Sequence, residues 1–127
     1  METKLSILVV DRFNRPAETW KRVSELVDGG AVKVVSGPED AESELSSGHY
    51  DLILCSYRLP SETGTEFIAR LRARGLETPV IFLSISMDSK GVVETAGIRM
   101  ADFLAAPFSS EELSQRIRLL CGTPAHP

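Results

Sequence analysis

Five short runs of aliphatic residues, each followed by a segment with helical periodicity, constrain the fold of this chain more than any other feature. The runs cover residues 5–10, 31–36, 52–56, 80–83 and 101–104. Short runs rich in Val, Ile and Leu are typical of strands that are buried on both faces of a parallel sheet. Strict alternation of strand and helix therefore predicts an α/β fold with helices on both faces of one sheet.

The segments between these runs carry the start signals of helices. Pro16 and Pro38 stand where a first helical turn accepts proline, and Ser109 is a typical N-cap residue. We expect helices from Pro16 to the Gly29-Gly30 pair, over 38–47 and over 64–74, a short helix between 89 and 96, and a last helix from 109 to about 120. Five strands and five helices follow.

Length and composition indicate a single domain. The 127 residues are enough for one domain, which we place at 1–121, followed by a tail or the start of a linker at 122–127. A net charge of −4 offers no electrostatic reason for nucleic-acid or membrane binding. Without a bilayer-length apolar run or a signal peptide, we expect a cytoplasmic location, with Cys55 and Cys121 as free thiols.

The candidate functional positions lie at the ends of the predicted strands. Asp11 and Arg12 come after the first strand, Ser56 ends the third, Ser84 follows the fourth, and Ala106 follows the fifth. Parallel α/β sheets gather their chemistry at the carboxyl ends of the strands, because these ends share one edge of the sheet. We therefore expect these five positions to form one site.

These positions, with the stretch from Asp51 to Pro60 and the Pro107-Phe108 pair, resemble the receiver domains of response regulators. Receivers take a phosphoryl group from a histidine kinase onto an aspartate. The resemblance spans about residues 5–120 and implies a flavodoxin-like, doubly wound, five-stranded parallel sheet in the order 2-1-3-4-5. It also implies a signalling module that is not an enzyme, and a cis peptide bond before Pro107.

The same resemblance shows what the site lacks. The family places two acids after the first strand, the acceptor aspartate after the third, a hydroxyl after the fourth and a lysine after the fifth. Asp11 and Ser84 match this pattern, whereas Arg12, Ser56 and Ala106 replace the second acid, the acceptor and the lysine. The sequence thus predicts a degenerate receiver without the usual phosphorylation.

The charge of the site points the same way. A working receiver site carries three carboxylates and one lysine, which a divalent cation neutralises, whereas Asp11 and Arg12 already cancel. We expect no cofactor and lost or weak magnesium binding. We also expect the Arg12 guanidinium to lie over the metal position and to fork onto Asp11; the alternative is an arginine that points into solvent.

If the site is chemically silent, the domain acts through a surface. The resemblance implies an output face made by the fourth helix, fifth strand and fifth helix, with Phe103 as its switch aromatic and Lys90 and Arg99 on its surface. We expect a protein partner there: a kinase, an effector domain or a second copy.

Three alternatives remain open at this stage. Ser56 or Ser84 is a substrate for a different class of kinase, or the chain binds a flavin as flavodoxins do, although residues 11–16 lack a glycine-rich phosphate loop. The third alternative is that the chain is the N-terminal regulatory domain of a longer transcriptional regulator or hybrid kinase. The sequence names neither the partner nor the pathway.

Overall fold

The strands of the computed structural model, which describes residues 4–122, form one parallel sheet. They are β1 (Ser6–Val10), β2 (Ala31–Val35), β3 (Leu52–Ser56), β4 (Val80–Ser84) and β5 (Ala101–Ala105), in the order β2-β1-β3-β4-β5. The predicted fold class and strand order are therefore confirmed. The predicted tail lies mostly outside the described residues.

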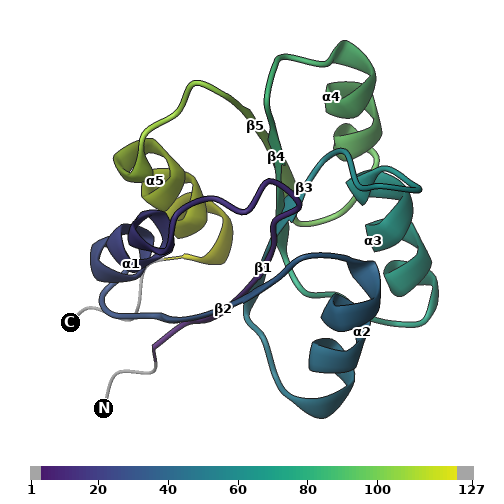
Figure 1. Ribbon diagram of the computed structural model, residues 1–127. Coiled ribbons are helices and arrows are strands. Elements are labelled where there is room, and N and C mark those ends of the chain that lie inside the picture. Colours follow the sequence, from purple (N-terminus) through teal and green to yellow (C-terminus); the bar gives the residue numbers. More distant parts are fainter. Residues whose placement is uncertain (1–3, 123–127) are drawn as a thin grey trace.

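The helices divide between the two faces of the sheet, as Figure 1 shows. They are α1 (Ala17–Leu26), α2 (Pro38–Ser47), α3 (Gly64–Ala73), α4 (Ser89–Ala96) and α5 (Ser110–Cys121). The helices α1 and α5 cover one face, and α2, α3 and α4 cover the other. None of the helices in the range 4–122 is long and apolar enough to cross a bilayer.

Each face has its own core. Trp20 and Val23 of α1 pack with Leu113 and Ile117 of α5 against one side of β1, β3 and β4. The other core includes Phe67, Ile68 and Leu71 of α3. Successive side chains of a strand point to opposite faces, so the central strands contribute to both cores. Every residue of β3 and β4 is therefore buried.

Side-chain caps fix where the later helices begin. Thr63 and Glu66 form a reciprocal capping box at α3, Asp88 accepts a hydrogen bond from the Gly91 amide at α4, and Ser109 caps α5. These caps place the loops that follow β3, β4 and β5 at the same edge of the sheet as the loop that follows β1. The functional positions lie in these loops or at the strand ends that lead into them.

Candidate functional site

The loop after β1 closes around the carboxylate of Asp11. This side chain is buried, and it accepts hydrogen bonds from the amides of Phe13 (3.1 Å) and Arg15 (2.7 Å). The Arg15 guanidinium adds a charge-assisted bond of 2.9 Å to Oδ1. The carboxylate is thus both neutralised and saturated with donors from its own loop.

The predicted contact between Arg12 and Asp11 is wrong, because Arg15 takes that place. The loop turns at Asn14, which has a left-handed φ of 55°, and this turn brings Arg15 back onto Asp11. Arg12 instead places its guanidinium 5.1 Å from the centre of the Phe13 ring, and its side chain has no ion-pair partner within the described range 4–122. The signal that sequence reasoning missed is the Asp-x-x-x-Arg spacing.

Arg15 also joins two loops at this edge. Its guanidinium carbon lies 5.8 Å from the ring centre of Phe13 and 5.9 Å from that of Phe108, in the loop after β5. Ala106 begins this loop, and the bond between Ala106 and Pro107 is cis, as predicted. The positive charge that Ala106 lacks is present on Arg15, which reaches the same edge from the other side.

Ser56 and Ser84 lie at the ends of adjacent strands, and both are buried. Ser56 is 1% exposed, and its Oγ accepts a hydrogen bond of 3.3 Å from the Arg12 amide. Ser84 is 6% exposed, and its Oγ donates to the carbonyl oxygen of Ser86 over 2.6 Å. Both hydroxyls therefore have structural partners in neighbouring loops.

These residues do not fit a magnesium ion. A hard divalent cation needs several free oxygen ligands, of which carboxylates are the strongest. Asp11 is already paired with a guanidinium, and Ser56 and Ser84 offer only hydroxyls. No group of three or more metal-ligating His, Cys, Asp or Glu side chains occurs in the part of the chain that the structure describes.

A second cluster connects the site to α4. Tyr57 directly follows Ser56, and its buried ring packs edge-on against Phe103 with 5.5 Å between ring centres. Its hydroxyl donates to Glu94 of α4 over 3.0 Å, and Thr65 donates to the same oxygen over 2.7 Å. Burial and this bond to a carboxylate raise the pKa of Tyr57 to about 12.

Gly91 makes this close contact between α4 and the two rings. A Cβ at this position would lie 2.7 Å from Phe103 Cε2 and 2.9 Å from Tyr57 Cζ. These distances are shorter than real Cβ contacts, so any larger residue must displace a ring or the helix. Sequence reasoning found Phe103, whereas Tyr57, Gly91 and Glu94 emerge only from the structure.

The other residues predicted for the output face have different surroundings. Lys90 is exposed in the first turn of α4, and Phe103 is half-buried on β5. Arg99 is exposed in the loop before β5 and is ion-paired with Glu77 of the loop after α3. Through this ion pair Arg99 faces the loop after α3, and not the predicted phosphorylation positions.

Neither cysteine has the lowered thiol pKa that is typical of a reactive or metal-binding cysteine. Cys55 is fully buried in β3, and burial raises the pKa of its thiol, which suppresses the thiolate. Burial also raises the pKa of Cys121 to about 11. Both thiols are free, as predicted.

This arrangement, with a parallel five-stranded sheet and five functional positions at one edge, defines a class of signalling domain. The chain belongs to the response regulator receiver domain family, which residues 7–118 match. Membership of this family argues against the alternative of a flavin-binding, flavodoxin-like protein, because members of the family are signalling modules.

Individual relatives agree with this assignment. The chain is 33% identical to the transcriptional regulatory protein DltR of Streptococcus agalactiae over 91% of its own length and 51% of that protein. It is 38% identical to the transcriptional regulatory protein CiaR of Streptococcus pneumoniae over 75% of its length and 42% of that protein. The chain thus spans about half the length of the curated relatives it matches.

Solved structures show the same fold. A putative response regulator from Chloroflexus aurantiacus superimposes with a TM-score of 0.80 at 25% identity, covering 94% of this chain and 98% of that one. The beryllofluoride-activated receiver domain of DrrB superimposes with a TM-score of 0.72 at 26% identity, covering 93% and 97%. The chain therefore shares its fold with solved receiver structures.

Proposed function

We propose that this receiver domain signals in a two-component or phosphorelay system without accepting a phosphoryl group at the usual site. The observation that carries the proposal is the state of Asp11 and Ser56. Ser56 replaces the acceptor at the end of β3, and the Asp11 carboxylate is committed to Arg15 and two loop amides. Nucleophile, metal ligand and lysine are lost together.

The alternative of serine phosphorylation is disfavoured by the same geometry. A serine oxygen needs a base to become a nucleophile, and Asp11 already carries three hydrogen bonds. A protein kinase would also have to reach hydroxyls that are only 1% and 6% exposed, at Ser56 and Ser84. The domain would have to open locally before either site could be modified.

The surface made by α4, β5 and α5 is the part of the domain that we propose contacts a partner. Phe103 on β5 and Lys90 on α4 lie on it, and Arg99 lies at its edge. Val93 of α4 is 72% exposed, so the surface also offers apolar area. A kinase, an effector domain or a second copy are the partner classes. The relatives are transcriptional regulatory proteins about twice as long, which favours an effector domain.

The chemical part of the proposal is tested by incubation with acetyl phosphate or beryllofluoride in the presence of magnesium. We expect no one-phosphate gain in intact mass and no magnesium-dependent spectral change. A matched variant that restores the family residues, Arg12→Asp with Ser56→Asp and Ala106→Lys, shows that the assay detects the modification. A phosphate on the wild-type peptide around Ser56 would contradict the proposal.

The surface part is tested by charge reversals on two faces. Arg99→Glu and Arg74→Glu each change the net charge equally and each remove one ion-paired arginine, with Glu77 and Glu42 respectively. We expect Lys90→Glu and Arg99→Glu to weaken partner binding or self-association in a pull-down or sedimentation assay, and Arg74→Glu to leave it unchanged. Equal losses on both faces would show that another surface is in use.

A further inference from the structure

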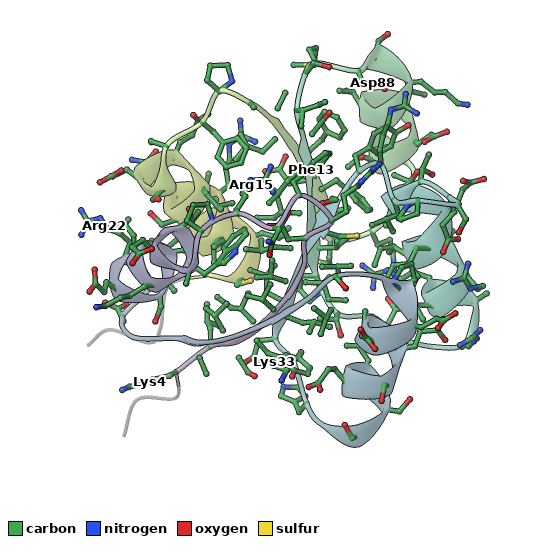
Figure 2. All side chains as sticks on the ribbon, in the orientation of Figure 1. Lys4, Phe13, Arg15, Arg22, Lys33 and Asp88 are labelled. Atoms are coloured by element: carbon green, nitrogen blue, oxygen red, sulfur yellow. The ribbon has the colours of Figure 1, made fainter. Side chains whose placement is uncertain are left out.

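The vacated phosphorylation site opens into a cavity of about 220 Å³ at the carboxyl ends of the strands. Its charged lining consists of Arg12, Arg58 and Asp88, and its apolar lining includes Phe13 and Ile85. Figure 2 shows Phe13 and Asp88 at the same end of the molecule, far from Lys4. The cavity therefore combines guanidinium groups with apolar walls.

The charges of this cavity do not cancel. Arg58 donates from Nη2 to Asp88 Oδ2 over 2.9 Å, so these two groups neutralise each other. The guanidinium carbon of Arg12 lies over the Phe13 ring, and Arg12 has no ion-pair partner among residues 4–122. Asp11 is neutralised by Arg15 behind the cavity. One positive charge is left over at the position where the family needs two negative ones.

We infer that this cavity binds a small organic anion non-covalently, with its carboxylate or phosphate on Arg12. A guanidinium matches the geometry of both oxyanions, and a guanidinium that already rests on an aromatic ring loses less freedom on binding. Phe13 and Ile85 contact the apolar body of the ligand. The volume equals that of about seven water molecules, which suits a molecule with a single ring.

Binding at this place would provide an input that needs no phosphoryl transfer. Ile85, Ser86 and Asp88 belong to the loop that leads directly into α4, and they line the cavity. A ligand that prefers one position of this loop would shift the equilibrium of the α4 surface. No covalent bond forms or breaks, so the inference is independent of the absence of phosphorylation and goes beyond it.

The test is a titration of the isotope-labelled chain, followed by amide NMR at physiological salt, with four probes. Phenyl phosphate and benzoate carry head and body, inorganic phosphate carries only the head, and phenol carries only the body. We expect saturable shifts at Arg12, Phe13 and residues 84–88 with the first two. The affinity for phenol and for inorganic phosphate should each be lower by a factor of about ten or more.

Three variants separate a site from general charge attraction. Arg12→Gln should weaken the binding of phenyl phosphate about tenfold, because it removes the unpaired guanidinium. Asp88→Asn keeps a capping oxygen for the Gly91 amide but removes the opposing charge, so it should tighten binding about two- to fivefold. Arg22→Gln, on exposed α1, should have no effect.

Several results would overturn the inference. They are an absence of saturable shifts with both phenyl phosphate and benzoate, an unchanged affinity in Arg12→Gln, or an unchanged or weaker affinity in Asp88→Asn. Dispersed spectra of the free variants establish that each is folded. Intact mass after titration separates the two proposals, because a phosphate gain contradicts the silent site, whereas a lack of binding contradicts only the anion cavity.

Discussion

Removal of the Arg15 side chain tests the reassignment of the cation from Arg12 to Arg15. The bond from Arg15 Nη1 to Asp11 spans 2.9 Å, and the two side chains are only 20% and 1% exposed, so solvent screens it weakly. A hydrogen bond to a charged group contributes about 1.5–3 kcal/mol, and ring contacts of a partly exposed guanidinium add about 0.5–1 kcal/mol. Two loop amides still bind Asp11, so the carboxylate is not stranded.

We therefore expect Arg15→Ala to lower the free energy of unfolding by about 2–4 kcal/mol. Arg12→Ala should cost no more than about 0.5 kcal/mol, because its guanidinium is exposed and makes no ion pair in the described range 4–122. Urea unfolding followed by the fluorescence of Trp20, which is buried on the inner side of α1, gives both values.

A double-mutant cycle with Asp11→Asn isolates the ion pair. In that background Arg15→Ala should cost about 1 kcal/mol or less, because only the ring contacts remain to be lost. Equal costs for Arg12→Ala and Arg15→Ala would refute the reasoning. So would an undiminished cost of Arg15→Ala in the Asp11→Asn background, since the effect would then come from packing alone.

Three further predictions follow from the cluster at α4 and from the thiols. Gly91→Ala should destabilise the domain, because overpacking costs about 1–3 kcal/mol whereas the gain in helix propensity is about 1 kcal/mol. Near-ultraviolet spectra should report the displacement of the Phe103 ring, and a stabilised variant would contradict the packing. The pKa of Tyr57 is raised to about 12, so its contribution is complete below pH 10 and is lost as the pH rises toward 12. The difference in the free energy of unfolding between wild type and Tyr57→Phe, measured by urea titration, should shrink by about 1.4 kcal/mol at pH 11, and a constant difference would count against this assignment. Thiol reagents should modify Cys121 slowly and Cys55 only after unfolding, and rapid labelling of native Cys55 would disprove its burial.

The fold was predictable from local patterns that the tertiary structure does not override. The aliphatic runs coincide with the strands, and Pro38 and Ser109 lie where helices begin. The expected burial on both faces holds for β3 and β4, but not for β2 and β5, which lie at the edges of the sheet and are partly exposed. The topology then brings Asp11, Ser56 and Ser84 to one edge, because parallel strands end together. These placements need only the order of the elements.

The direction of side chains in the loops was not predictable in the same way. Whether Arg12 or Arg15 reaches Asp11 depends on the left-handed turn at Asn14, which sequence spacing alone does not specify. The bond between Tyr57 and Glu94 joins residues 37 positions apart and depends on how α4 docks. Such contacts are decided by packing, so a residue list carried over from a family misses them.

A short path of contacts links the site to the surface that we propose contacts a partner, and this path decides what an input must do here. Ser56 ends β3, the next residue, Tyr57, packs on Phe103, and Gly91 lets α4 close over both rings. Under the proposal that Ser56 takes no phosphoryl group, no new charge arises at the end of β3, and Arg15 already pairs with Asp11. A change in this packing then requires a ligand with unequal affinity for two arrangements of the loop before α4; without such a ligand, the proposed surface is constitutive. The leftover charge of Arg12, beside that loop, favours the first possibility, and the opposite effects expected of Arg12→Gln and Asp88→Asn distinguish it from the second.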